Sequence, residues 1–314
     1  MRHTQNGSVW ADGAMREWSD LSVPLMSDAI LRAASVFDGI RADLTPDGRI
    51  RLLAGRAHIE RLVRSARIMR LPLAYDVDEI LLAAARVAQV ELASTHQHIA
   101  YVRPMLVGAA LTEHASQTSL TIAAFAQDDK LPDPIWMQIA ALRRPSSDSV
   151  PPEMKAVANY QQTRMLRMAA QADGYADALL LNEHGRLAES TGAAVVVEHA
   201  GRLISPPTWE SCLPSVTIEI LERLAREIGI AFVREPVPLA SVLAADGLAL
   251  AGTLASLVPV CGVDGVPIPS GPAIGRLRDA YLAALHPKEE DSRFVGLMAY
   301  VEFSERDLLE KNES

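Results

Sequence analysis

The residue of this chain best suited to covalent chemistry is a lysine in the stretch PPEMKAVANYQQ, residues 151–162. Lys155 is one of only four lysines among 30 basic residues, so arginine supplies nearly all of the positive charge. A lysine amine can lose its proton and attack a carbonyl, whereas a guanidinium stays charged. The choice of lysine at this position therefore makes it a candidate for Schiff-base chemistry, although the stretch alone favours an ordinary surface lysine.

A lysine that held an aldehyde cofactor such as pyridoxal phosphate would need three kinds of partner, and each has a candidate. Glu189, in GRLAESTGAAVVV, could face a pyridine nitrogen. The stretch LPSVTIEIL predicts a helix start, where the N–H groups of Ser215, Val216 and Thr217 could bind a phosphate. The Gly-Thr turn in AGTLAS, residues 251–256, could offer N–H groups to a substrate anion. Each motif alone also fits an ordinary strand end, helix start or turn.

The elements that would position these residues alternate between strands and helices. The hydrophobic periodicity predicts a hairpin, two helices and two strands in the first part of the chain: residues 8–18, 56–72, 77–94, 98–110 and 119–127. In the second part it predicts helices over residues 159–175, 214–230 and 271–285. It predicts strands over residues 135–144, 247–254 and 257–263, and strands separated by two turns over residues 176–207. The charged tail from His286 is expected to be partly disordered.

The polar stretch QDDKLPDP, residues 127–134, carries two prolines and predicts an interdomain loop. We therefore expect a small α+β domain over residues 1–126 and a larger domain over residues 135–314.

Composition excludes several kinds of partner. The net charge is −9 and there is no basic block, which argues against nucleic acid and anionic membranes as partners. No apolar run is long enough to span a bilayer, and the polar N-terminus has no signal-peptide core. Two cysteines make neither a disulfide framework nor a zinc site, so we expect no metal. These features favour a cytoplasmic protein.

Seven stretches, taken in order, resemble the branched-chain aminotransferase family, which belongs to the fold type IV enzymes that use pyridoxal 5′-phosphate. They are SVFDGIRA (35–42), HIERLVRSARIMRLP (58–72), YVRPMLVG (101–108), KAVANY (155–160), RLAESTG (186–192), SCLPSVT (211–217) and AGTLASLVPV (251–260). The resemblance implies an α/β fold with an α+β small domain and a larger pseudo-barrel domain. It also implies transamination between an L-amino acid and a 2-keto acid, with a lysine aldimine and a pyridoxamine form as alternating states.

Carried over position by position, the resemblance implies a role for each residue of the site. Lys155 would form the Schiff base and move the proton between the substrate Cα and the cofactor C4′. Glu189 would pair with the pyridinium nitrogen, and Tyr160 would hydrogen-bond the phenolic oxygen. Two further sets would bind the phosphate (Arg61, Val216, Thr217 and Thr253) and line the substrate side (Phe37, Tyr101, Arg103 and Leu254).

The chain departs from the family pattern where the substrate pocket is built. Arg32, Gln127 and Lys130 stand at positions where branched-chain enzymes have aromatic residues. An unpaired cation in an apolar wall would oppose the binding of leucine or valine. We therefore expect a polar or acidic substrate, with Arg32 and Lys130 as its counter-charges; the alternative is that both side chains point to solvent. Ala193 and Ala194 also replace the family's Glu and Asn, which would loosen the support of Glu189.

Two other activities on the same scaffold stay open. One is a lyase of the aminodeoxychorismate lyase type, and the other is a transaminase for D-amino acids or amines. The resemblance also implies a homodimer or higher homo-oligomer, in which a loop near residues 107–117 reaches the partner's site.

Overall fold

A computed structural model describes residues 8–109, 117–254, 256–285 and 295–309, and the chain divides into two units. The first unit runs to Lys130 and includes Met154–Ala158 and the segment that starts at Ala299. The second unit consists of Leu131–Glu153 and Asn159–Met298. The change of unit after Lys130 lies inside the stretch expected to be a linker. Lys155 and the segment from Ala299, which we expected in the larger domain, make their contacts with the first unit instead.

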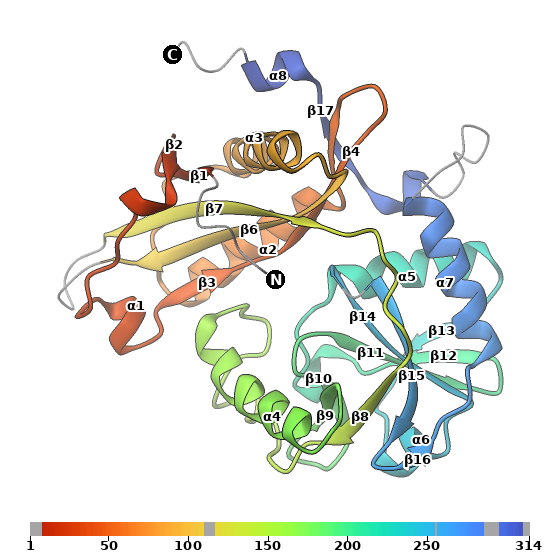
Figure 1. The fold of residues 1–314 in the computed structure, drawn as a ribbon. Coiled ribbons are helices and arrows are strands. Elements are labelled where there is room, and N and C mark those ends of the chain that lie inside the picture. Colours follow the sequence, from red (N-terminus) through yellow and green to blue (C-terminus); the bar gives the residue numbers. More distant parts are fainter. Residues whose placement is uncertain (1–7, 110–116, 255, 286–294, 310–314) are drawn as a thin grey trace. The chain divides into compact units, whose positions relative to one another are not determined.

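The first unit is built on an eight-stranded sheet in the order β17-β5-β4-β6-β7-β1-β2, with β3 paired to β6 (Figure 1). Its strands are β1 (Ser8–Ala11), β2 (Ala14–Glu17), β3 (Ser35–Phe37), β4 (Ile40–Leu44), β5 (Ile50–Leu52), β6 (Ile99–Gly108), β7 (Thr118–Gln127) and β17 (Val301–Phe303). The predicted hairpin is confirmed, because β1 and β2 pair around Asp12 and Gly13, whose φ angles are 46° and 96°. Such paired positive φ angles are what a tight two-residue hairpin needs.

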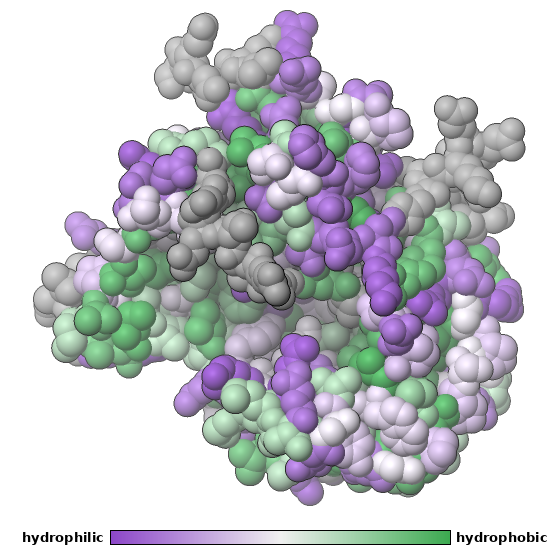
Figure 2. Space-filling view, in the orientation of Figure 1, coloured by the Kyte–Doolittle hydropathy of each residue, from purple (hydrophilic) through white to green (hydrophobic). Residues whose placement is uncertain are grey.

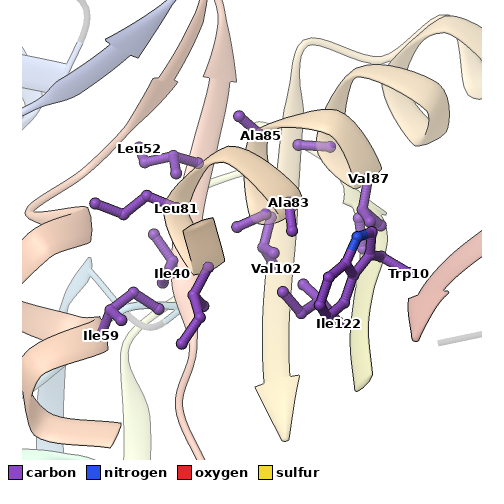
Figure 3. Packing of buried hydrophobic residues seen from close by; sticks show 14 of the residues in the cluster. Trp10, Ile40, Leu52, Ile59, Leu81, Ala83, Ala85, Val87, Val102 and Ile122 are labelled. Carbon is purple, nitrogen blue, oxygen red and sulfur yellow. The ribbon is translucent and has the colours of Figure 1, made fainter. Parts of the chain in front are cut away.

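The helices of this unit are α1 (Asp28–Leu31), α2 (Gly55–Ile68), α3 (Val77–Thr95) and α8 (Glu305–Leu309). α3 begins in a capping box, in which Asp76 accepts from the Glu79 N–H and Glu79 accepts from the Asp76 N–H. It packs along β6 and β7 (Figure 1). Figure 3 shows Ile40, Ile59 and Leu81 meeting beneath it from β4, α2 and α3. This apolar contact holds α2 against the sheet, and α2 carries His58, Arg61 and Ser65.

The second unit is built on a nine-stranded mixed sheet in the order β10-β9-β8-β15-β14-β11-β12-β13, with β16 paired to β15. Its strands are β8 (Ile135–Ile139), β9 (Asp177–Leu181), β10 (Leu187–Ser190), β11 (Ala194–His199), β12 (Arg202–Ser205), β13 (Phe232–Arg234), β14 (Gly247–Gly252), β15 (Ser256–Val263) and β16 (Val266–Pro267). Its helices are α4 (Tyr160–Ala172), α5 (Val216–Glu227), α6 (Leu239–Leu243) and α7 (Pro272–Leu285). The β8–β9, β8–β15 and β12–β13 pairs are parallel and the other pairs are antiparallel.

The charged tail contains short elements within the part that the structure describes. Residues 286–294 lie outside the described residues, but the chain then forms the short 3-10 helix η4 (Val295–Met298), β17 and α8. β17 extends the first sheet, with Val301 opposite Leu52 and Phe303 opposite Ile50. The sequence did not predict β17, because three residues are too short to show a period in the sequence.

Exposed apolar side chains gather around α1, where Figure 2 shows a cluster of hydrophobic atoms. Leu25, Met26, Ile30 and Leu31 are all more than half exposed. A contiguous apolar group of this kind is typical of an interaction surface. Among the described residues, no helix is long and apolar enough to cross a bilayer.

Candidate active site

The backbone of Lys155 is fixed by β3 and α2. The Phe37 N–H donates to the Lys155 carbonyl at 3.1 Å, and the Lys155 N–H donates to Ser65 Oγ at 3.0 Å. Val36 and Ala156 form an isolated antiparallel bridge beside it. The Met154 and Ala156 side chains are buried, whereas Lys155 is half-buried. The lysine is thus held between two buried neighbours, and its side chain stays partly exposed.

Phe37, Tyr101 and Arg103, the predicted substrate-side residues, lie together in the unit that holds Lys155. The Lys155 Nζ lies 5.0 Å from the Phe37 ring centroid, and the Arg103 guanidinium carbon lies 5.4 Å from the same centroid. Arg103 also lies 5.1 Å from the Tyr101 ring centroid, and its Nη2 donates to the Tyr101 hydroxyl at 3.3 Å. Two cations therefore share one aromatic ring, which is a favourable arrangement for each of them.

Gly39 makes room for the Tyr101 side chain. A Cβ at position 39 would lie 2.1 Å from the Tyr101 hydroxyl oxygen, a distance at which one of the two residues must move. The glycine in SVFDGIRA is thus required by the close approach of an aromatic side chain.

Arg61, the predicted phosphate ligand of the first unit, is buried and paired with a carboxylate that the sequence analysis missed. Its Nε and Nη2 donate to Asp38 at 2.9 and 2.7 Å. The His58 Nδ1 lies 2.8 Å from the same carboxylate. Burial opposes the ionisation of Asp38, but the Arg61 charge and the hydrogen bonds from Arg61 and His58 outweigh it and hold the pKa of Asp38 well below its usual range. Asp38 and His58 both lie inside the motifs quoted above, so the signal was present.

Glu189, the predicted partner of the pyridine nitrogen, is held by two donors in the second unit. Arg144 Nη1 lies 2.9 Å from Glu189 Oε1, and the Leu213 N–H donates to Oε2 at 3.1 Å. Arg144 also donates from Nε to the Ser211 carbonyl at 3.0 Å. The two side chains are only 8% and 12% exposed, so the pair is largely shielded from water. Arg144 lies in the stretch ALRRPSS, and its spacing gave no reason to select it.

The turn that follows Glu189 is also well supported, despite Ala193 and Ala194. The Ser190 hydroxyl accepts from the Gly192 and Ala193 N–H groups at 3.3 and 3.0 Å. Thr191 donates to the buried Asp177 carboxylate. Burial raises the pKa of Asp177, and the Thr191 hydrogen bond acts against that rise. Hydroxyl groups therefore stabilise this turn in place of the family's Glu and Asn.

The remaining predicted cofactor residues lie at element boundaries of the second unit. α5 begins at Val216, and Ser215 caps it by accepting from the Ile218 N–H at 3.3 Å. Helix geometry leaves the N–H groups of Val216 and Thr217 without an intrahelical acceptor. Thr253 lies in the turn between β14 and β15, and Tyr160 is the first residue of α4. Helix starts and turns of this kind present backbone donors to anions.

The structure shows less support for the other substrate-side residues. Arg32 pairs with Asp28 one helical turn earlier, and its side chain is 54% exposed. Lys130 is exposed, and the neighbouring Asp129 carboxylate lies 4.0 Å from Arg41. Leu254 is 46% exposed. Arg32 and Lys130 are thus both exposed, which agrees with the alternative interpretation, whereas Gln127 is partly buried and its Nε2 donates to the Phe125 and Ala126 carbonyls at 3.0 and 2.8 Å.

Cys212 lies beside this site but is not a reactive thiol. Its Sγ donates to the Ala188 carbonyl at 3.0 Å, and burial, together with the Glu189 charge, raises its pKa well above the ordinary value. A thiol held in the protonated form is a poor nucleophile. Within the described residues, no group of three His, Cys, Asp or Glu side chains could hold a metal ion.

These donors fit pyridoxal 5′-phosphate chemically. In the first unit, a fixed lysine suits the aldehyde and a buried arginine suits a phosphate monoester. In the second unit, a shielded carboxylate suits the ring nitrogen and a helix N-terminus suits a phosphate.

The chain belongs to the class IV aminotransferase family, because residues 35–263 match the model of Amino-transferase class IV. A branched-chain-amino-acid aminotransferase of Escherichia coli (strain K12) is 29% identical over 296 residues, covering 90% of this chain and 94% of the relative. The structure of a branched-chain aminotransferase from Thermoproteus uzoniensis with norvaline matches with a TM-score of 0.86 at 26% identity, covering 94% of this chain and 99% of that one. The structure of a branched-chain amino acid aminotransferase from Thermobaculum terrenum in its PLP form matches with a TM-score of 0.84 at 26% identity, covering 95% and 99%.

The predicted family, fold type IV architecture and cofactor are therefore confirmed. The chain is a PLP-dependent class IV aminotransferase. The residue-by-residue roles stay predictions.

Proposed function

We propose that this aminotransferase acts on an L-amino acid with an acidic or strongly polar side chain and on the corresponding 2-keto acids. Bound pyridoxal phosphate supplies an electron sink for the electrons of the substrate Cα–H bond. Lys155 Nζ would hold the cofactor aldehyde and would move the proton that leaves Cα. Glu189 would hold a positive charge at the ring nitrogen, and Arg61 and the α5 N-terminus would each offer donors to a phosphate.

The observation that carries the substrate proposal is Arg103. Its guanidinium lies over the Phe37 ring, which the Lys155 amine also approaches, and it is held by the Tyr101 hydroxyl. A substrate joined to a cofactor on Lys155 therefore has a fixed cation in the same unit. A guanidinium binds a carboxylate through two parallel hydrogen bonds, so a distal carboxylate is the complementary group.

Arg32 and Lys130 are secondary counter-charges in this proposal. The Asp28 carboxylate already neutralises much of the Arg32 charge. Lys130 and Arg103 are both exposed, and Arg103 is ranked first because it lies over the Phe37 ring that the Lys155 amine also approaches. The apolar benefit that a leucine side chain would gain is about 1.5–3 kcal/mol on full burial. A guanidinium beside the substrate reduces that benefit.

The test is a rate comparison on the holoenzyme. Formation of pyridoxamine phosphate is followed with L-glutamate, L-aspartate, L-leucine, L-valine, D-alanine and a simple amine. We expect the acidic donors to react fastest, and Arg103→Met to slow them about 10–100-fold while changing leucine little, because a hydrogen bond to a charged group contributes about 1.5–3 kcal/mol. Arg32→Tyr serves as the matched arginine variant and should have a smaller effect.

Three results would contradict the proposal. Faster reaction with leucine and valine than with the acidic donors would show that branched-chain amino acids are the preferred substrates. Fast reaction with D-alanine or the amine would mean the opposite stereochemistry or an amine substrate. A holoenzyme whose cofactor no donor converts to pyridoxamine phosphate would favour a lyase.

We further propose that the chain forms a homodimer or higher homo-oligomer through the apolar cluster around α1. Leu25, Met26, Ile30 and Leu31 form a group of exposed apolar side chains, which is typical of an interaction surface. The loop expected to reach a partner's site, residues 107–117, lies largely outside the described residues. Light scattering should give at least twice the 34.0 kDa chain mass, and Leu25→Asp with Ile30→Asp should reduce it. A monomeric native protein would refute this interface.

A further inference from the structure

Asp38 stands out among the buried charged residues because its side chain accepts hydrogen bonds from three different residues. It is fully buried in the turn after β3, and its own N–H donates to the Pro104 carbonyl at 3.0 Å. Its Oδ1 accepts from the Gly39 N–H at 2.7 Å, from His58 Nδ1 at 2.8 Å and from Arg61 Nη2 at 2.7 Å. Its Oδ2 accepts from Arg61 Nε at 2.9 Å.

These bonds fix the plane of the Arg61 guanidinium. Two of its nitrogens, Nε and Nη2, meet the two oxygens of one carboxylate, which is the fork geometry that arginine prefers. Because the carboxylate is itself pinned by the Gly39 N–H and by a backbone hydrogen bond, the guanidinium cannot turn without breaking several bonds. The edge of Arg61 that Asp38 does not occupy therefore has a fixed direction as well.

His58 completes the support of Asp38. Burial lowers the pKa of His58, although Asp38 acts in the opposite direction. A neutral imidazole carries one proton, and an ionised carboxylate can only accept, so the proton belongs on Nδ1. His58 thus donates to Asp38 and adds a second donor residue to the carboxylate that holds Arg61.

The same face of α2 also holds the backbone of Lys155. His58, Arg61 and Ser65 are three and four residues apart, so they lie on one side of the helix. The Ser65 hydroxyl donates to the Arg61 carbonyl at 2.8 Å and accepts from the Lys155 N–H at 3.0 Å. One helix face therefore connects the cation expected at the phosphate with the lysine expected at the aldehyde.

We infer that Asp38 and His58 are positioning residues that orient Arg61 for the phosphate group of the cofactor before the cofactor binds. This inference rests on the proposed role of Arg61 as a phosphate ligand. Neither residue needs to touch the cofactor. An arginine already held in its binding orientation loses less side-chain freedom on binding a phosphate, so the phosphate contributes more to affinity.

The test separates the phosphate from the rest of the cofactor. Full-length apoenzyme is titrated with pyridoxal phosphate and with pyridoxal. The dissociation constant for pyridoxal divided by that for pyridoxal phosphate measures the contribution of the phosphate, and this ratio is large when the phosphate is bound tightly. Asp38→Asn should lower this ratio about tenfold, which is the lower end of what one hydrogen bond to a charged group contributes. His58→Gln, which leaves the Asp38–Arg61 pair in place, should lower it in the same direction by less.

A matched control is available in the same unit. Asp43 is buried and accepts from Arg41 Nε at 2.9 Å, so it is a second buried aspartate paired with an arginine. Asp43→Asn should leave the ratio unchanged even where it lowers thermal stability. Loss of folding alone would weaken binding of both ligands equally, so it would not change the ratio. Where Asp38→Asn does not fold, His58→Gln supplies the measurement.

The outcomes distinguish the inference from the function on which it rests. If Arg61→Leu lowers the ratio while folded Asp38→Asn and His58→Gln keep the native value, the positioning role is overturned. If Arg61→Leu also keeps the native ratio, Arg61 is not the phosphate ligand and the inference fails with that assignment. Native protein that prefers pyridoxal phosphate but forms no pyridoxamine phosphate with any amino donor would refute transamination alone.

Discussion

Removal of the Arg144 side chain should destabilise the second unit more than any exposed arginine does. Arg144→Met would leave the Glu189 carboxylate with the Leu213 N–H as the one remaining donor among the contacts described above. The pair is 2.9 Å apart and its side chains are only 8% and 12% exposed. Breaking a buried pair by removing one partner costs about 3–5 kcal/mol, because the other charge stays buried.

A double-mutant cycle isolates this effect. Glu189→Gln removes the charge from the other side, and the variant that carries both substitutions has no buried unpaired charge. We therefore expect the double variant to lose less free energy of unfolding than the sum of the two single variants, by about 1–3 kcal/mol. Arg202→Met is the control, because its partner Glu235 lies at 3.3 Å and both side chains are 46% exposed. That change should cost no more than about 1 kcal/mol.

The assay is urea unfolding of the apoenzyme, followed by far-UV circular dichroism at neutral pH. The apoenzyme is used because bound cofactor would add its own stabilisation. The reasoning is refuted if Arg144→Met and Arg202→Met shift the transition equally. It is also refuted if the two single effects simply add in the double variant.

Three other changes have definite expected outcomes. Lys155→Arg should abolish formation of pyridoxamine phosphate while the circular dichroism spectrum stays native, because a guanidinium forms no Schiff base; residual turnover would count against Lys155. Gly39→Ala should displace the Tyr101 ring, because the added Cβ would lie 2.1 Å from its hydroxyl oxygen. The rate of transamination should fall, and the melting temperature should fall by at least a few degrees. An unchanged rate would show that Tyr101 is not needed. Because the folded pKa of Asp38 lies below its unfolded value, its stabilisation is present above about pH 4 and is lost as pH falls. The free energy of unfolding between pH 5 and 3 should therefore fall less steeply in Asp38→Asn than in the native protein. Equal slopes would mean that the contacts of Asp38 do not lower its pKa in the folded protein.

Much of the fold followed from local patterns in the sequence. The Asp12-Gly13 hairpin and the start of α5 after Ser215 both depend on residues within four positions of one another. Local backbone preferences and caps decide such features, so the sequence is sufficient to predict them.

The contacts that support the site could not be predicted in the same way. Arg61 and Asp38 are 23 residues apart. Glu189 lies in β10, whereas its partner Arg144 lies in the loop that follows β8. Ion pairs between distant residues depend on the tertiary structure, and no periodicity indicates them. The place of β17 on the first sheet has the same cause, because a three-residue strand is defined by its partner Leu52 rather than by its own sequence.

The substrate-side expectations show where position in an alignment is insufficient. Arg32 occupies a position that an aromatic residue holds in branched-chain enzymes, but its guanidinium pairs with Asp28 on its own helix turn. The aligned position therefore gave the residue type but not its partner. Arg103 was assigned to the substrate side by resemblance, and its placement over Phe37 makes it the stronger candidate for a counter-charge.

The most direct test of the central claim is the stoichiometry of a single half-reaction. Holoenzyme is mixed with L-glutamate in the absence of any keto acid, and the cofactor is then released and quantified together with the keto acid formed. The account predicts one equivalent of pyridoxamine phosphate and one equivalent of 2-oxoglutarate per active site, and neither with Lys155→Arg. Keto acid formation beyond one equivalent, or an unchanged cofactor with every amino donor, would contradict transamination through Lys155.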